Sequence, residues 1–470
     1  MDSDEEFRDS RWTRRENASH IMYDEIIPSM PTEDSKPYCI WYEIASEETY
    51  RKLFKRYPDM RYQIGRACAA AGYDTLYGEL NLLPDVSIAE EARETNNDGS
   101  KRIFNEIMSQ PTRYAVMDDY TRTINVSDPQ PGAYLNGDTA VRSSLHTDYE
   151  GEIDDDMRDP HYFDITEDIG PSRMHAGHRN MDHEVLPQQF EYLLWSPLPR
   201  DLPTTRKDAL IVMAAYEGNL DRYLRLRRPS MVADECCAVQ RGIYHNTTFA
   251  KWWSLQDPGT LGPNSQYILE AINARFIMNN DLSRIDPETP ENNDVPRLFW
   301  HPLFPQERTL RELVRRRPRT AFQAALVCIA ANYQYTYDAL DVAPHYITYQ
   351  QARMSHNPHY ALDIERRAAE SGVDLHPNTH LSHLTRPDKE PTTLAIEPGI
   401  RAFRGALVEA HLKGIYPGEL QANAASWELF ICVPNELKRR AEVEELMLYP
   451  ESDDIESWKG LISRDQGTRI

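Results

Sequence analysis

The sequence predicts a mostly α-helical protein: a solenoid-like array of repeated helical hairpins with long irregular inserts and few short strands. Shifting the chain along itself by 260 positions aligns Thr49–Arg93 with Thr309–Arg353 without a gap, and one position in three is identical. The shared residues are mostly small or apolar and recur at helical spacing, which indicates a reused structural unit. With 470 residues, 40% of them hydrophobic, the chain is long enough to fold as several units.

Each aligned unit starts with a segment centred on a tryptophan. The segment reads Pro37-Tyr-Cys-Ile-Trp41-Tyr in one copy and Pro296-Arg-Leu-Phe-Trp300-His in the other. A middle copy carries Trp195 in a similar setting. Aromatic residues often dominate binding surfaces, but a tryptophan at the start of a repeat is more typical of a buried anchor. We therefore expect all three tryptophans to be core residues.

A short helix is expected next. Thr309-Leu-Arg-Glu312 has the pattern of a capping box, in which the Thr side chain accepts the amide hydrogen of the third helical residue and Glu312 reaches back. Apolar residues follow at helical spacing, and Pro318 ends the run. The other copy retains Leu53 and Pro58 but replaces the acidic half of the box with lysine.

A second helix is expected over 60–71 and 320–331. It ends in small residues that let a neighbouring helix approach closely, and Gly72 and Asn332 follow, two residue types that tolerate a left-handed backbone. A returning helix should then bury pairs of residues three apart. These pairs are Tyr77 with Leu80 and Tyr337 with Leu340.

The middle copy runs from Lys207 to Gly218 and continues to Tyr223 and Leu226. Its spacing of Ala214, Ala215, Gly218, Tyr223 and Leu226 resembles the helical core of an ankyrin repeat. Cys68-Ala69-x-x-Gly72 with Tyr77 and Leu80 is similar, and Cys328-Ile329-x-x-Asn332 is a degenerate version. The chain as a whole resembles a family of ankyrin-like proteins of filamentous fungi. The resemblance implies an ankyrin-like helical-hairpin array and no particular activity.

Composition divides the chain further, because polar and charged stretches separate the periodic ones. The expected parts are a polar, acidic N-terminal tail (1–34), a first repeat module (35–127), an acidic, partly mobile insert (128–188), a middle repeat module (189–290), a third repeat module that copies 35–97 (295–374), a loop (375–394), a C-terminal helical capping module (395–450) and a tail (451–470).

The formal net charge of −23 disfavours non-specific attraction to nucleic-acid backbones or anionic membranes and favours a protein partner with a basic surface. No apolar stretch reaches the roughly 18 residues of a membrane span, and no export signal is recognisable. The six cysteines have the character of small buried hydrophobes rather than of a disulfide framework. We expect a soluble protein of the cytoplasm or nucleus that binds neither membranes nor nucleic acid.

Common catalytic and phosphate-binding motifs are absent from the sequence. Two histidine groups come closest to a metal site: His175, His178 and His183, and His376, His380 and His383. Both lie in hydrophilic stretches, so we interpret them as solvated. The acidic run 150–156 lacks the ligand spacing of a calcium loop. No residue is therefore assigned a catalytic, cofactor-binding or metal-binding role.

Two arginine-rich stretches, 311–319 and 222–228, could bind phosphate groups. Both lie where helices are predicted to end, and cations there complement the negative end of the helix dipole. We favour helix termination for both.

The leading hypothesis is a non-enzymatic protein–protein interaction scaffold, because stacked helical hairpins expose an extended surface. Two alternatives stay open. One is an enzyme of unrecognised class with a site assembled between repeat modules. The other is a nucleic-acid-associated factor that uses the arginine-rich helix ends.

Overall fold

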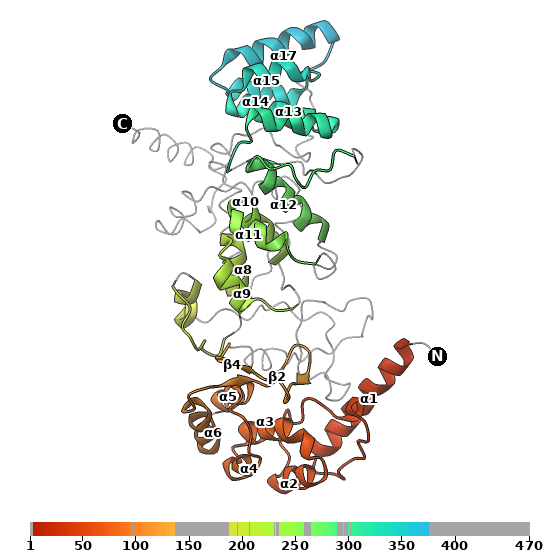
Figure 1. The fold of residues 1–470 in the computed structure, drawn as a ribbon, viewed down its shortest axis with the longest axis vertical. Helices are drawn as coiled ribbons and strands as arrows, with labels where there is room; N and C mark the ends of the chain where they lie inside the picture. Colours follow the sequence, from red (N-terminus) through yellow and green to blue (C-terminus); the bar gives the residue numbers. More distant parts are fainter. Residues whose placement is uncertain are drawn as a thin grey trace, which may run out of the picture. The chain divides into compact units, whose positions relative to one another are not determined.

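A computed structural model gives the fold (Figure 1). The structure describes residues 3–95, 97–136, 188–194, 196–205, 207–229, 231, 235–257, 265–288, 295, 299–300 and 302–375. Over these residues the protein is mostly helical and contains four two-residue strands, which confirms the predicted fold class at that level. Both histidine groups, the acidic run 150–156, Trp195 and all residues from 376 onward lie outside the described part.

The chain forms two compact units. Among the described residues, the first unit comprises 3–210 and 226–231, and the second comprises 211–225 and 235–375. We describe each unit by itself.

Over its described residues, the first unit contains six complete α-helices, short 3-10 turns and a bent β-hairpin. Its elements are α1 (Ser3–Met22), η1 (Glu33–Ser35), α2 (Glu47–Arg56), η2 (Pro58–Met60), α3 (Arg61–Ala71), α4 (Asp74–Glu79), α5 (Val86–Glu94), α6 (Asp98–Met108), β1 (Tyr114–Ala115), β2 (Met117–Asp118), β3 (Thr123–Ile124), β4 (Gln130–Pro131) and η5 (Gln188–Leu194). Strand β1 pairs with β4 and β2 with β3, both antiparallel, so residues 114–131 form one hairpin with an irregular second arm.

The second unit is built from helices and one 3-10 turn over its described residues. They are α8 (Asp208–Glu217), which begins at the boundary of the two units, α9 (Leu220–Leu226), α10 (Glu235–His245), α11 (Thr247–Trp253), α12 (Ser265–Met278), α13 (Glu307–Arg316), η7 (Pro318–Thr320), α14 (Ala321–Ala331), α15 (Gln334–Leu340), α16 (Tyr346–Met354) and α17 (Pro358–Ser371).

The self-similarity of the sequence corresponds to matching local structure. Helices α2, α3 and α5 have the same bounds as α13, α14 and α16 after a shift of 260, and α4 begins at the residue that corresponds to the start of α15. Gly72 and Asn332 end the second helix of each copy with φ of 83° and 58°, the left-handed backbone that the sequence predicts. We call α2–α6 the first copy and α13–α17 the third copy.

The match continues beyond the aligned sequence. Asn97 caps α6 and Asn357 caps α17, again 260 positions apart. Both lie next to the left-handed turn of their copy. A Cβ on Gly72 would collide with the Asn97 side chain, and the Asn357 side chain donates a hydrogen bond to Asn332 at 2.9 Å. Each copy is therefore a pair of helical hairpins, α3–α4 with α5–α6 and α14–α15 with α16–α17.

The match also extends upstream, where the sequence analysis expected only a polar tail. Asp24 and Asn280 both have left-handed backbones, with φ of 58° and 65°, two residues after the ends of α1 and α12. The Asp24 carboxylate accepts hydrogen bonds from the Ser46 amide and the Thr49 hydroxyl. Asn280 accepts the corresponding bonds from Gln306 and Thr309.

The predicted capping box of α13 is wrong. The helix begins at Glu307, and its N-cap, Gln306, makes no side-chain capping bond. The Thr309 hydroxyl instead donates to Asn280 at 2.8 Å. The α2 helix is capped locally by Ser46, whose side chain accepts the Thr49 amide.

Both copies bury their second helix. Ala67, Cys68 and Ala69 of α3 have no exposed surface, and neither do Leu326, Val327 and Cys328 of α14. Trp41 and Trp300 are also buried, as the structural interpretation of the tryptophans predicts. Small side chains on α3 allow close contact with α5 and α6, which places charged residues of these helices within reach of one another.

Candidate functional site

A buried polar cluster distinguishes the first copy from the third. It consists of Tyr38, Trp41, Arg66, Glu91 and Asp119, and we call it the Arg66 cluster. These residues come from the tryptophan segment, α3, α5 and the tip of the β-hairpin. The positions that correspond to Arg66 and Glu91 in the third copy hold Leu326 and Gln351.

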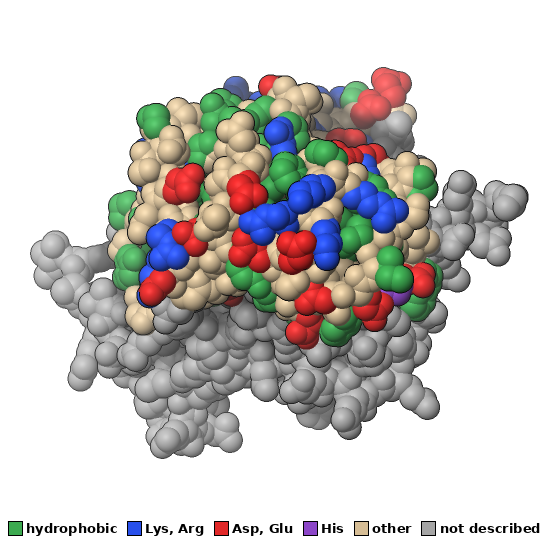
Figure 2. Space-filling model, turned by 90° about the horizontal axis from the view of Figure 1, so that it is seen from below, with side chains coloured by type: hydrophobic (Ala, Val, Ile, Leu, Met, Phe, Trp, Pro, Cys, Tyr) green, Lys and Arg blue, Asp and Glu red, His purple; other side chains and the backbone are tan. Residues whose placement is uncertain are grey.

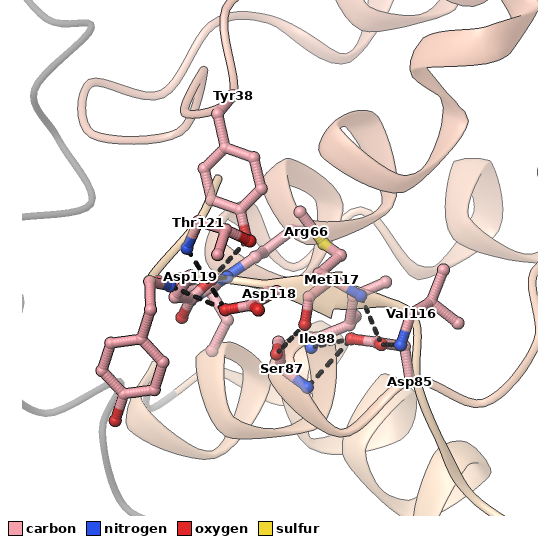
Figure 3. A network of polar contacts seen from close by, with 12 residues as sticks. Tyr38, Arg66, Asp85, Ser87, Ile88, Val116, Met117, Asp118, Asp119 and Thr121 are labelled. Carbon is pink, nitrogen blue, oxygen red and sulfur yellow. Dashed lines mark hydrogen bonds and ion pairs between the residues drawn. The ribbon is translucent and has the colours of Figure 1, made fainter. Parts of the chain in front are cut away.

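The Arg66 guanidinium contacts the other groups of the cluster, and Figure 3 shows it beside Asp119 and Tyr38. Its Nε donates to Glu91 Oε2 at 3.1 Å, its Nη2 donates to Asp119 Oδ2 at 2.9 Å, and its Nη1 pairs with the other Asp119 oxygen. The Trp41 ring covers the guanidinium at 4.7 Å from its centroid. The Tyr38 hydroxyl donates to Asp119. This is bidentate recognition of one carboxylate with a second carboxylate and an aromatic face beside it.

The charges in the cluster depend on one another. Burial alone would lower the pKa of Arg66, but Asp119 and Glu91 raise it well above its ordinary value, so the guanidinium stays charged. Burial and then Asp119 raise the pKa of Tyr38, so the phenol keeps its proton and donates. Buried charges are stable only when they are paired in this way.

A second buried carboxylate, Asp85, fixes the hairpin to α5. Its Oδ1 accepts the amide hydrogens of Ser87 and Ile88 at 2.9 and 3.0 Å, which caps the helix, and its Oδ2 accepts those of Val116 and Met117 at 2.7 and 3.2 Å (Figure 3). Burial raises the pKa of Asp85 to about 6, although the hydrogen bonds oppose this shift. The carboxylate thus connects the start of α5 with the junction between β1 and β2.

Further polar contacts hold residues 201 and 202 against the same region. Arg93 Nη1 donates to the carbonyl oxygen of Leu202 at 2.7 Å. Asp201 pairs with Arg113 at 3.1 Å and accepts the Leu135 amide at 3.0 Å. Burial lowers the pKa of Arg93. Residues 201 and 202 are therefore held beside α5 and the two ends of the hairpin by charged groups.

This arrangement is suited to holding segments together. The side chains of Arg66 and Glu91 have no exposed surface, and that of Asp119 has 10%. A substrate cannot reach groups that are covered in this way. Among the described residues, no three His, Cys, Asp or Glu side chains are placed to share a metal ion. The Arg66 cluster and Asp85 therefore position the β-hairpin on α3 and α5.

The Arg66 cluster was not predicted from the sequence. The residues lie far apart in the sequence, with 25 positions between Arg66 and Glu91 and 53 between Arg66 and Asp119. The available signal was Arg66, an arginine in the middle of a helix whose second half is otherwise made of small residues. Such a residue either reaches solvent or pairs inside the protein, and only the structure shows which.

The repeated tyrosines and the arginines of 311–319 make contacts inside the fold. Tyr77, Tyr223 and Tyr337 are buried. In the arginine-rich stretch 311–319, Arg316 donates to the carbonyl oxygens of residues 282 and 285, and Arg317 donates to that of residue 286. Hydrogen bonds from Arg315 and Arg316 lower the pKa of Glu312 to about 2. These contacts fit helix termination.

Comparison with known proteins adds one similarity. Within the part of the chain that the structure describes, no helix combines the length and apolar character needed to cross a membrane. Neither the curated proteins nor the solved structures that were compared contain a match. The family model described as the YKP1 C-terminal domain matches residues 41–147, the stretch that contains Trp41, Arg66, Asp85, Glu91 and Asp119.

Proposed function

We propose that this protein is a non-enzymatic scaffold, an ankyrin-like array of helical repeats that binds another protein through the outer surfaces of its hairpins. The observation that carries this proposal is the contrast between interior and exterior in the two copies. Leu53 and Leu313 are both fully buried, as are Cys68 and Cys328. Exposed positions of the same helices differ in charge and size, as they do for Glu48 and Arg308.

This contrast is typical of a structural unit that is reused for binding. Selection for packing keeps the interior, because each hairpin must bury its apolar face against its neighbour. Selection for a partner acts on the outside, where side chains contact other molecules. The closed Arg66 cluster supports the same proposal, since it stabilises a surface without exposing reactive groups.

We place this function in the cytoplasm or nucleus. Cys39, Cys68, Cys236 and Cys328 are free thiols, and the first, second and fourth are buried. Burial raises the pKa of Cys236 to about 11 and that of Cys328 to about 12, which makes both thiols unreactive at neutral pH. Such cysteines are compatible with a reducing compartment.

The test is purification of the full-length chain under native conditions, followed by cross-linking and measurement of the mass of the complex. We expect a protein partner in fixed stoichiometry. Val126→Thr, at an exposed position of the β-hairpin and outside the helical hairpins, is a matched control and should leave the complex intact. A chain that stays free of any stoichiometric protein partner under several salt conditions would overturn the proposal.

A further inference from the structure

The two copies present different outer faces. We define the first-copy outer face by Glu48, Arg51, Thr75, Glu79 and Arg102. The third-copy outer face consists of the corresponding residues Arg308, Arg311, Tyr335, Ala339 and Leu362. Both faces are formed by the outer helices of their copy: α2, α4 and α6 in one, and α13, α15 and α17 in the other.

Ion pairs cross the first-copy outer face from helix to helix. Arg51 Nη2 lies 2.9 Å from Glu79 Oε1, which links α2 to α4, and Arg102 Nε lies 2.7 Å from Asp74 Oδ2, which links α6 to α4. Figure 2 views the first unit from its α2 and α4 side and shows basic and acidic side chains interspersed. The face satisfies its own charges, so it offers little to a charged partner.

The third-copy outer face has lost these carboxylates. Ala339 stands in place of Glu79, Gln334 in place of Asp74, and Arg308 in place of Glu48. Among the described residues, no ion pair joins Arg311 to another helix, and its guanidinium lies over the Tyr335 ring, 5.9 Å from the ring centroid. Arg308 is exposed. Two guanidinium groups on this face are thus available to an anion.

The same face exposes large apolar side chains. Tyr335 is 75% exposed and Leu362 is 63% exposed, at the positions of Thr75 and Arg102. Exposed hydrogen bonds link their helices, since His359 bonds to Asp338 at 2.7 Å and Asn357 donates to Gln334 at 3.0 Å. Tyrosine and arginine are the residue types that contribute most to binding hot spots.

We propose that the third-copy outer face binds an acidic segment of a partner protein, with carboxylates on Arg308 and Arg311 and a large apolar side chain against Tyr335 and Leu362. This inference rests on the proposed scaffold function and names its partner chemistry. It differs from the basic partner that the net charge alone favours. An anionic membrane would also meet arginine and apolar groups, but its extended negative surface repels a chain of net charge −23 far more than a short peptide does.

The test uses the full-length chain and a labelled peptide, Asp-Glu-Glu-Leu-Phe-Glu-Glu-Asp. We expect at least tenfold tighter binding than for a peptide with lysine in place of every acidic residue, or with glycine in place of Leu-Phe. A variant with the first-copy residues, Arg308→Glu, Tyr335→Thr, Ala339→Glu and Leu362→Arg, should lose at least tenfold in affinity. Circular dichroism confirms folding, and Lys52→Glu on the first-copy outer face is the control.

Equal peptide binding by this four-substitution variant would overturn the inference, as would variant-sensitive binding to phosphatidylserine vesicles without binding to the peptide. The native complex separates this failure from that of the scaffold itself. If the variant still forms a stoichiometric complex with the native partner, the third-copy outer face is not the binding surface and the scaffold proposal stands. If the wild-type chain forms no such complex, the scaffold proposal fails.

Discussion

At the scale of single residues, buried carboxylates determine how the first unit is held together. Asp85 has no exposed surface and accepts four backbone amide hydrogens, two from a helix start and two from the hairpin. A side chain that accepts four backbone N–H groups cannot be replaced by one that itself donates hydrogen bonds without loss of stability. Arg66 is the corresponding cation, with two carboxylates and one indole ring around it.

We expect Asp85→Asn to lower the free energy of unfolding by about 2 kcal/mol at pH 7. The amide nitrogen of Asn would face two backbone N–H groups and leave both without an acceptor. Urea unfolding followed by circular dichroism measures the change. Asp98→Asn, at an exposed position of α6, should change stability by less than about 0.5 kcal/mol. Equal stability of the two variants would show that Asp85 does not hold the hairpin.

The pH dependence of this effect has a defined sign. Because burial raises the pKa of Asp85 to about 6, the folded chain keeps a proton that the unfolded chain releases above about pH 4. The part of the stability that depends on this retained proton is thus fully present below about pH 4 and is lost as the pH rises through about 6, whereas the four accepted hydrogen bonds remain at pH 7. The difference in unfolding free energy between wild type and Asp85→Asn should shrink from pH 4 to pH 7. A difference that grows over this range would contradict the assignment.

Arg66→Leu should lower the free energy of unfolding by about 3 to 5 kcal/mol, because it leaves Glu91 and Asp119 buried without a cation. Leucine is the residue of the third copy, where Gln351 replaces the carboxylate of Glu91. Adding Glu91→Gln should therefore recover part of the loss. A double-mutant cycle by urea unfolding gives the coupling energy. Additive effects of the two substitutions would show that the pair does not interact.

At the scale of helices, two glycines of the first copy have opposite roles. A Cβ on Gly99 of α6 would lie far inside contact distance of the Gly72 carbonyl oxygen, whereas a Cβ on Gly78 of α4 would meet nothing within 4 Å. The first glycine allows two helix ends to meet. The second only weakens its helix, since glycine loses more backbone entropy on folding than alanine.

Gly78→Ala should accordingly stabilise the protein by about 0.5 to 1 kcal/mol, and Gly99→Ala should destabilise it by about 2 kcal/mol or more. Thermal unfolding of both variants beside wild type tests the pair, because the two substitutions are chemically identical and both lie in helices. Destabilisation by both would indicate that the position of Gly78 is not open.

The hairpins were predictable from the sequence because their signals are local. Apolar spacing, Pro58 and Pro318, and the left-handed residues Gly72 and Asn332 each act within a few residues. Helix α1 was not predictable in this way. The chain between α12 and α13 is four residues longer than the chain between α1 and α2, so an ungapped comparison does not align α1 with α12. The prediction of a capping box was wrong because the Thr309 hydroxyl donates to Asn280, 29 positions away in the sequence. The Arg66 cluster was not predictable for the same reason, since its residues meet only through tertiary contacts.

At the scale of the whole molecule, each unit has its own core. The polar groups that fix the hairpin, from Arg66 to Asp201, all belong to the first unit. The third copy belongs to the second unit and packs around α14. Disturbing one core should therefore leave the other intact.

Hydrogen exchange tests this independence. We expect Arg66→Leu to increase exchange in peptides that cover α3, α5 and residues 114–131, and to leave α14 and α16 at wild-type protection. The control is Leu326→Ala in α14, which should have the opposite distribution because Leu326 is fully buried in the second unit. Loss of protection in both units with either variant would show that the chain unfolds as one cooperative block.

The paired left-handed residues Asp24 and Asn280 mark where each repeated module begins. Each follows a helix and accepts hydrogen bonds from the start of the next one, so α1 belongs with α2 as α12 belongs with α13. A recombinant fragment that started at Trp41 would therefore cut through this module and lose the Asp24 contact that anchors α2.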